Sequence, residues 1–600
     1  MAVHCLLSDW ESCENDFRHI VDDPRNWSKI PLLNAVPSYE LCDHQLVRFR
    51  GMIQHMFNPE FYLGQYEVEH NVSKAKETRS GRYRDVIQCS PEEKVIDNSN
   101  DGIEERQVLY CITTPALNDW VHQEERKWGS QQLSGTESSK PLSTGTKRQA
   151  EDEEPMEVDA PGSNGTVSGV ITASERSGHE NKRLSSGCSR GNVGESSSCP
   201  ALSLNFPIDG APGIACIVKT YDTDSLAPLK LNDVVDVVGF LSLDPSLAHT
   251  SSSLGTDSEN MAENPPPSVV PRLHAVALQK LTLLNKVPAD LGEVFQSAQN
   301  VRKELHFVLS QMLLGDTIAA DYLICHLISL VYMRKDGLAL GHFPMNLSNL
   351  PQRPDYTRLL YSVLERILPK SHYLPMTLEN MNTLSFVPKM DYEANRLSSG
   401  LLQLSDNTHL IVDETRLQAG KLDAAGIANV QALRTLISQQ LVNYDFQYYS
   451  KPYDTDVPVL ILSEGKSLLP CDVLVPLKVD PACLSTLPEV FQAANHFLRD
   501  PLLSAIRTYL CVMRHSTYEF PEDLQKKAQE DFVEMRQAGG QNVSADDLHL
   551  LLVLARLVSL SNGEKTVSVG AWEQAKKLEA ERKRRIGTEH VRSSTLSNEP

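Results

Sequence analysis

The sequence predicts a multidomain α+β protein with β-barrel elements in its amino-terminal half and an α/β domain in its carboxyl-terminal half. Two segments, 41–130 and 201–286, contain short strand-like runs separated by Gly and Pro, as is typical of a small barrel. Over 287–485, helical apolar stripes alternate with short apolar runs, which indicates an α/β domain. The pattern over 486–590 is mostly helical.

The composition argues against several classes of protein. The 600 residues include 57 Lys and Arg against 78 Asp and Glu, and the formal charge of −21 disfavours nucleic acid as a primary ligand. The twelve cysteines lack a C-x-x-C spacing, so we expect neither disulfides nor a metal site. The run 322–333 is too short to cross a bilayer, and no secretory signal is evident, so we expect a soluble intracellular protein.

Several stretches are expected to lie outside the folded domains. Residues 1–40 mix helical and turn signals, and we expect a short helical lead-in there. Three other stretches are poor in large apolar side chains and cannot bury enough surface to offset the entropy of ordering. We therefore expect disorder in the linker 131–200, in a loop at about 248–268 and in the tail 591–600.

The second β-rich segment contains a pattern typical of an OB-fold hairpin. Residues 231–241 read L-N-D-V-V-D-V-V-G-F-L, with a turn expected at Asn232 and Asp233 and a bulge at Gly239. The sequence leaves open whether the two β-rich segments complete one barrel or build two.

Arginines and aromatic residues alternate in the first β-rich segment. Such interleaving occurs in single-strand nucleic-acid binders, where bases stack on aromatic rings. The alternative places the aromatics in the barrel wall and the arginines on a solvated face, and the acidic composition favours it. The residues concerned are Arg48, Arg50, Arg82, Arg84, Phe49, Tyr62 and Tyr83.

A buried strand that ends in two acids is the most informative feature for function. Residues 408–412 are mostly β-branched or apolar and lead directly into Asp413 and Glu414. In nucleotide-binding α/β sheets, the chemistry lies at such strand ends, where an Asp-Glu pair can hold Mg²⁺ and activate a water. For the isolated pattern, two solvated acids after a buried strand are about as good an explanation. Upstream, a strand is expected at 343–348 and a helix at 356–368.

The run 399–415, S-G-L-L-Q-L-S-D-N-T-H-L-I-V-D-E-T, resembles the Walker B segment of the mini-chromosome maintenance (MCM) helicases. The resemblance implies a degenerate AAA+-like domain over 287–485 with a helical lid over 486–590. The motifs at 49–62 and 531–536 are similar to those of MCM-binding proteins, a family of degenerate relatives of the helicase subunits.

The segment 313–323, L-L-G-D-T-I-A-A-D-Y-L, is similar to the helicase phosphate-binding loop. Gly315 and Asp316 match that motif, whereas Ile318, Asp321 and Tyr322 replace its glycine, lysine and serine. A phosphate site needs converging N–H groups, a Lys and a hydroxyl, and an Asp in place of the Lys would repel a triphosphate.

The other catalytic positions implied by the resemblance are also replaced. Glu464 falls near the sensor-1 Asn, and Pro470 and Cys471 occupy the position of the Ser-Arg pair that supplies an arginine finger. Asp546 stands in place of the sensor-2 Arg. We therefore expect no ATPase activity and no cofactor.

The resemblance implies a non-catalytic protein whose partners are MCM helicase subunits. It further implies a nuclear role in the assembly of the MCM complex and its release from chromatin during DNA replication, in support of sister-chromatid cohesion, with indirect chromatin association. A weak ATPase and a single-strand nucleic-acid-binding protein are the alternatives.

A basic run near the carboxyl terminus has two interpretations. It is a candidate nuclear localisation signal, or it pairs with the dipole at the C-terminus of a helix. The run consists of Arg582, Lys583, Arg584 and Arg585.

Overall fold

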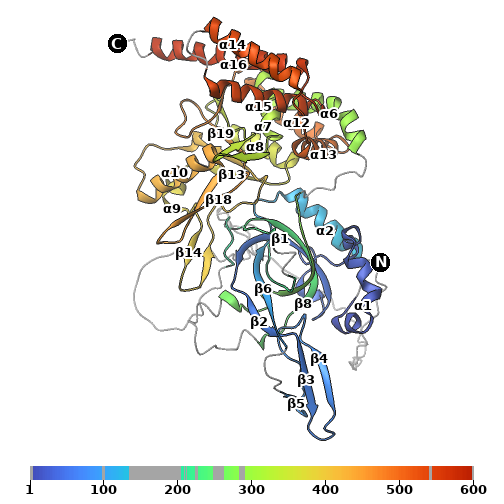
Figure 1. The fold of residues 1–600 in the computed structure, drawn as a ribbon. Helices are drawn as coiled ribbons and strands as arrows, with labels where there is room; N and C mark the ends of the chain where they lie inside the picture. The colour runs from blue at the N-terminus through green and yellow to red at the C-terminus, as the bar shows by residue number, and fades with distance from the viewer. Residues whose placement is uncertain are drawn as a thin grey trace, which may run out of the picture. The chain divides into compact units, whose positions relative to one another are not determined.

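The predicted α+β class is confirmed, because several β-sheets and many helices make up the computed structural model (Figure 1). Met1–Thr136 and Leu204–Pro600 form one compact unit. Most of the predicted disordered linker and loop, and the end of the tail, lie outside the described residues. The residues that the structure describes are 5–96, 102–133, 204–208, 210, 212–222, 228–246, 262–282, 291–539 and 544–596.

The amino-terminal segment forms the helix α1 (Leu7–Val21) and the short 3-10 helices η1 (Pro24–Lys29) and η2 (Ser38–Glu40). Trp10 and Trp27 are buried, and the indole N–H of Trp27 donates to the carbonyl of Val21 at 2.8 Å. The ring of Trp10 packs edge-on against Phe240 at 5.8 Å. These two tryptophans thus anchor the segment on the neighbouring β-sheet.

Five strands close into one barrel. β1 pairs with both β6 and β8, β6 with β7, and β8 with β9, all antiparallel, and a parallel contact between β7 and β9 completes the ring. Two strands of the first β-rich segment, β1 and β6, and three strands of the second, β7, β8 and β9, share this ring, so the two segments build one barrel and not two. The strands are β1 (Leu46–Met56), β6 (Ile103–Ile112), β7 (Ala215–Thr220), β8 (Val234–Ser242) and β9 (Arg272–Lys280).

The predicted turn and bulge of the second segment are confirmed. Asn232 has a φ of 72°, in the left-handed region that Asn tolerates in tight turns. The register of β8 against β9 shifts between Val238 and Gly239, which marks a bulge. A Cβ at Gly239 would lie 2.2 Å from the carbonyl oxygen of His274, so only glycine fits where the two strands approach.

Smaller β-elements and one helix complete the amino-terminal half. β2 pairs with the start of β6, and β3 pairs with both β4 and β5 in a separate sheet. These elements are β2 (Glu60–Leu63), β3 (Gln65–His70), β4 (Lys76–Ser80), β5 (Glu93–Ile96) and α2 (Asp119–Leu133).

The carboxyl-terminal half is organised around a five-stranded parallel sheet with the order β13-β16-β19-β12-β20. Every residue of β12, β16 and β19 is buried, as expected for strands covered on both faces. The strands are β12 (Met345–Ser348), β13 (Ser371–Pro375), β16 (His409–Asp413), β19 (Val459–Leu462) and β20 (Val473–Pro476).

Alternate residues of β16 and of β19 enter two different cores. Ile411 belongs to a core with α6 to α8 and the carboxyl-terminal helices, whereas Leu410 and Val412 belong to a core with α10. Helices therefore cover both faces of the sheet (Figure 1). The helices are α6 (Leu291–Met312), α7 (Thr317–Leu327), α8 (Tyr356–Ile367), α9 (Leu378–Thr383), α10 (Ala424–Gln439), α11 (Pro481–Ser485), α12 (Leu487–Phe497), α13 (Leu502–His515), α14 (Glu522–Gly539), α15 (Ala545–Ser561) and α16 (Val569–Leu596).

Two features differ from the expected pattern or add to it. α16 continues to residue 596, into the predicted tail, because the sequence 591–596 contains no Gly or Pro that would stop a helix. Short strands form two further sheets, the pair β10-β11 and the four-stranded sheet β15-β14-β17-β18, which includes the hairpin of β17 and β18. They are β10 (Met333–Lys335), β11 (Leu338–Leu340), β14 (Lys389–Asp391), β15 (Arg396–Ser398), β17 (Leu441–Asp445) and β18 (Ser450–Asp454).

Candidate functional site

Asp413 ends β16 at the carboxyl edge of the parallel sheet, as predicted, and is completely buried. One carboxylate oxygen accepts hydrogen bonds from the Thr357 hydroxyl at 2.7 Å and from the Tyr373 hydroxyl. The other accepts the backbone N–H of Thr415 at 3.0 Å and its hydroxyl at 2.6 Å. Both oxygens are therefore engaged by the chain itself, and a hydrated Mg²⁺ would have to displace these donors.

Glu414 is half-buried and bonded to a different segment. Its carboxylate accepts the Ser467 hydroxyl at 2.9 Å and the backbone N–H of Leu468 at 3.2 Å. Burial raises the pKa of Glu414, and hydrogen bonds from these groups partly offset the shift. Glu414 thus acts as a link between η3 (Glu414–Arg416) and the loop after β19.

The loop 349–355 joins β12 to α8 and lies beside Asp413. The guanidinium of Arg416 donates to the carbonyl of Pro354, and its Nε lies 3.8 Å from Asp413. The loop reads N-L-P-Q-R-P-D, without glycine or lysine, and its two prolines have no N–H to offer. A phosphate cradle of converging backbone N–H groups is therefore missing where a strand-loop-helix unit would supply one.

The segment predicted as a phosphate-binding loop, 313–323, occupies a different position in the fold. It covers the turn between α6 and α7 and the first part of α7, and the element directly before this turn is the helix α6, whereas such a loop requires a strand before the helix. Gly315 has a φ of +85°, which the turn between the helices requires. Asp316 caps α7 by accepting the N–H groups of Ile318 and Ala319, each at 3.1 Å.

Asp316 nevertheless lies at the same edge of the sheet. Its carboxylate accepts the backbone N–H of Lys478, just beyond β20, at 2.9 Å. The Arg585 guanidinium pairs with it at 2.6 Å. A carboxylate of the chain thus occupies the anion-binding N-terminus of α7, and an arginine of the chain neutralises it.

Asp321 and Tyr322, which were predicted to replace the lysine and serine of a phosphate loop, have structural partners. Asp321 pairs with Arg302 at 2.7 Å and lies 3.6 Å from His306. Burial alone would raise the pKa of Asp321, but its interactions with His306 and Arg302 lower it. The Tyr322 hydroxyl donates to Glu579 at 3.1 Å, which connects α7 to α16.

The remaining predicted positions are dispersed. Glu464 follows β19 and accepts the side-chain amide of Gln352 at 3.3 Å, so it lies against the loop 349–355. Pro470 and Cys471 lie in the turn before β20, and burial raises the pKa of Cys471 to about 11. Asp546 is exposed in the first turn of α15, where an acid complements the helix dipole. Of these positions, Glu464 lies against the loop beside Asp413, and Cys471 lies near enough to Glu414 for the two charges to interact.

The basic run lies in the middle of α16, so its pairing with a helix C-terminus is not what the structure shows. Arg582 is buried and pairs with Glu579 at 2.7 Å, and Arg585 pairs with Asp316. Lys583 pairs with Asp547, whereas Arg584 is 61% exposed. Two of the four cations are thus part of the contact between α16 and the sheet.

The barrel arginines that suggested a nucleic-acid surface are mostly paired within the chain. Arg48 pairs with Asp236, and Arg50 lies 3.2 Å from the same carboxylate. Arg84 pairs with Glu11 at 2.8 Å. Arg82 lies over the Tyr83 and Tyr221 rings, and Phe49 is completely buried. Most of these arginines neutralise acids near the barrel.

Two further searches cover only the described part of the chain. It contains no cluster of three His, Cys, Asp or Glu residues that could hold a metal ion. No helix in it has the length and apolar character of a membrane span.

The comparisons with known proteins agree with the predicted resemblance. A family model described as Mini-chromosome maintenance replisome factor matches residues 17–586. The chain belongs to this family. Similar relatives are named mini-chromosome maintenance complex-binding protein. The relative from Gallus gallus is 40% identical over 609 residues, which cover 96% of this chain and 94% of the relative. The relative from Drosophila melanogaster is 38% identical over 597 residues, which cover 97% of this chain and 96% of the relative. The relative from Homo sapiens is 39% identical over 621 residues, which cover 98% of this chain and 95% of the relative.

Several side chains that fill the site in this member of the replisome factor family were not identified from the sequence. Thr357, Tyr373 and Arg416 surround Asp413 but come from three different segments. A signal for the loop 349–355 was present, since a strand at 343–348 and a helix at 356–368 were both expected. The phosphate-binding loop was instead predicted at 313–323, because Gly315 and Asp316 match the helicase motif.

Proposed function

We propose that this protein binds MCM helicase subunits and does not hydrolyse ATP. The printed names of its relatives describe binding to the MCM complex, and the family covers nearly the whole chain. The proposed absence of ATP hydrolysis rests on Asp413, because both oxygens of its carboxylate accept hydrogen bonds from hydroxyl and N–H groups of the same chain.

We also propose that the parallel sheet is a degenerate AAA+-like domain. Numbered by their place in the chain, the five strands lie across the sheet in the order 2-3-4-1-5. The connection that leaves β12 therefore runs towards one side of the sheet, and the connection that leaves the adjacent β19 runs towards the other side. Ligands of open α/β sheets bind at the carboxyl edge of such a point. Here Ser463, just after β19, donates to Asn346 of β12 at 2.9 Å, and the loop above them is proline-rich. The position of a nucleotide site is retained without the groups that bind phosphate.

The barrel supports the proposal of an OB-like fold. Numbered by their place in the chain, the five strands follow one another around the barrel in the order 1-2-3-5-4, and the third and fifth strands pair in parallel. A five-stranded Greek-key barrel of this kind is the OB architecture. The pairing of most of its arginines with acids of the chain favours a role in protein contacts over binding of nucleic acid.

The hairpin of β17 and β18 offers a surface for a helicase subunit. Its tip carries Tyr448 and Tyr449, which are 87% and 60% exposed, and Tyr392 contacts Tyr448 with ring centroids 6.1 Å apart. Aromatic side chains are enriched at protein interfaces, and solvent exposure of several together marks a binding surface. We propose that this tip contacts the helicase subunit.

The finer role follows from the family resemblance. As a helicase-like body without phosphate chemistry, the protein would occupy a place beside helicase subunits in the nucleus, regulate their assembly and release from chromatin, and support sister-chromatid cohesion. The test is to purify the tagged full chain from nuclear extract and identify bound proteins by mass spectrometry. Helicase subunits are expected in the eluate, and their absence would refute the proposed binding.

A further inference from the structure

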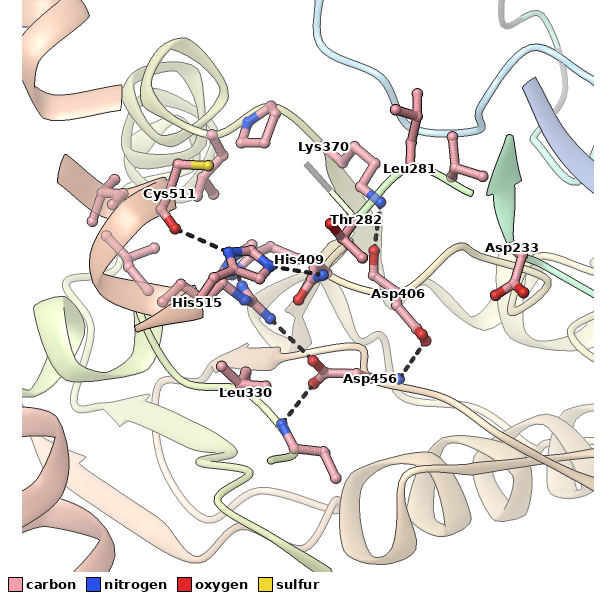
Figure 2. Close-up of a pocket in the computed structure, with 18 of the residues that line it drawn as sticks. Asp233, Leu281, Thr282, Leu330, Lys370, Asp406, His409, Asp456, Cys511 and His515 are labelled. Atoms are coloured by element: carbon pink, nitrogen blue, oxygen red, sulfur yellow. Dashed lines mark hydrogen bonds and ion pairs between the residues drawn. The ribbon is translucent and has the colours of Figure 1, made fainter. Parts of the chain in front are cut away.

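A cavity of about 250 Å³ lies at the edge of the parallel sheet opposite to the edge that carries Asp413. Figure 2 shows the residues that line this cavity. β13 and β16 begin at this edge, where Lys370 immediately precedes β13 and His409 is the first residue of β16. α13 supplies Arg514 to the same cavity. The cavity is therefore separate from the edge at which nucleotide chemistry would occur.

Arg514 is the main unmatched donor of the cavity. It is only 5% exposed. Its Nη1 donates to Nε2 of His409 at 2.8 Å, while its Nη2 lies 3.7 Å from Asp456, too far for a hydrogen bond. Nε and Nη2 have no hydrogen-bond acceptor among the described residues. A buried guanidinium with unmatched N–H groups is costly, and an acceptor that reached these groups from the cavity would be favoured.

His409 adds a second unmatched donor. Because Arg514 donates to Nε2, this nitrogen carries no hydrogen, and the neutral ring carries its hydrogen on Nδ1. Burial holds the pKa of His409 well below its usual value, which keeps the ring neutral. Nδ1 is buried and has no acceptor in the described part of the chain. Both unmatched groups therefore call for an acceptor.

Lys370 lies in the same wall. Its Nζ donates to the Ser405 hydroxyl at 2.8 Å and to the backbone carbonyl of Asp406, which leaves one further N–H when the amine is protonated. Burial lowers the pKa of Lys370 to about 7. An anion in the cavity would therefore draw a proton onto Lys370 near neutral pH.

The balance of charge in the cavity favours an anion. Lys280 pairs with Asp233 at 2.7 Å and Arg514 lies 3.7 Å from Asp456, which leaves Lys370 and Arg507 against Asp406. Burial raises the pKa of Asp456, and the Arg514 charge offsets part of this shift. The cationic residues that line the cavity are Lys280, Lys370, Arg507 and Arg514, and the acidic residues that line it are Asp233, Asp406 and Asp456.

The rest of the wall is apolar. Leu330 and Leu510 are among several aliphatic side chains that line the cavity. Ligand pockets of this kind combine an apolar lining with a few convergent polar groups.

We propose that this cavity binds a compact organic anion, with a carboxylate or phosphate group on the Arg514 guanidinium and an apolar body against the aliphatic wall. The planar guanidinium suits both head groups, because each can accept two parallel N–H bonds. The site is independent of the proposed helicase binding and of the Asp413 edge.

The test is isothermal titration of the full-length protein with three aromatic probes of similar size: phenyl phosphate, benzoate and benzylamine. Saturable one-to-one binding is expected for phenyl phosphate or benzoate, and the stronger of the two identifies the head group. Benzylamine is not expected to bind. Arg514→Gln is expected to weaken binding by about tenfold or more, whereas the exposed Arg499→Gln leaves it unchanged. For the wild type at pH 8, titrations in buffers of different ionisation enthalpy are expected to show that anion binding takes up protons. Lys370→Met is expected to abolish this uptake.

Leu330→Trp provides a second variant, because it fills the cavity and leaves Arg514 in place. It is expected to abolish binding, and it decides the question if Arg514→Gln does not fold. The proposal is overturned if neither anionic probe binds, if benzylamine binds equally well, or if binding persists in the folded variants.

Discussion

Arg585 Nη1 lies 2.6 Å from Asp316 Oδ2, and this ion pair joins the middle of α16 to the N-terminus of α7. The two side chains are 11% and 1% exposed. Asp316 also caps α7 and accepts the backbone N–H of Lys478 beyond β20. One carboxylate therefore holds together three segments that are far apart in the sequence.

Removal of the arginine from this pair should destabilise the carboxyl-terminal half. Arg585→Ala leaves the Asp316 charge buried without its cation, and we expect a loss of about 3 kcal/mol in the free energy of unfolding. Urea unfolding followed by circular dichroism measures the change. The matched control is Arg584→Ala, on the same helix but 61% exposed, which should leave the stability almost unchanged. Equal losses in the two variants would contradict the importance of the pair.

Substitution of Asp413 should change stability and not nucleotide affinity. Asp413→Ala removes the acceptor of the buried Thr357 and Tyr373 hydroxyls, and we expect a loss of about 3 kcal/mol in the free energy of unfolding. Titration with MgATP is expected to show no binding by either protein. The exposed Glu464→Ala serves as the control for stability. Micromolar, Mg²⁺-dependent ATP binding that Asp413→Ala abolishes would refute the non-catalytic proposal.

Burial of Lys370 should make stability depend on pH. Since its pKa is lowered from 10.5 to about 7, the unfolded chain binds more protons than the folded protein between these values. The destabilisation is complete below pH 7 and is relieved as the pH rises towards 10.5, with a slope of up to about 1.4 kcal/mol per pH unit.

The contribution of Lys370 is isolated by comparing the wild type with Lys370→Met, which should lack this rise in stability. The exposed Lys389→Met should keep it. His409, whose pKa is also lowered, would add a rise only below its usual value of 6.5. Parallel pH profiles for the wild type and Lys370→Met would show that the amine does not titrate in this range.

Loss of the hairpin aromatics should weaken binding to helicase subunits without affecting the fold. Tyr448→Ala combined with Tyr449→Ala removes two exposed rings at the tip of the β17–β18 hairpin, and we expect about a tenfold lower affinity. Pull-down with purified subunits and thermal unfolding measure the two effects. Tyr39→Ala, 84% exposed in another part of the chain, is the matched control and should bind normally. Unchanged binding by the double variant would place the interface elsewhere.

Local sequence patterns predicted those parts of the fold that depend on neighbouring residues. The strand ending at Asp413 follows from its apolar run, and the bulge at Gly239 follows from a glycine within a strand pattern. The helix expected at 356–368 corresponds to α8 (Tyr356–Ile367) for the same reason.

Features that depend on distant residues could not be predicted in this way. The cluster of Lys370, His409 and Arg514 joins segments more than a hundred residues apart at its furthest. The Gly-Asp match at 315–316 was misleading because the same two residues suit a helix-to-helix turn, with glycine at positive φ and Asp as the helix cap.

The closure of the barrel determines how the protein can vary. Ile112, near the end of one β-rich segment, is the register partner of Ala215, at the start of the next strand of the ring. The two ends of the intervening chain are thus fixed side by side, and each doubling of the length of a flexible connection costs only about 0.6 kcal/mol. By this relation, insertions and deletions between residues 133 and 204 would cost the barrel little, whereas changes within α2 would disturb contacts such as that of Glu125 with Arg50.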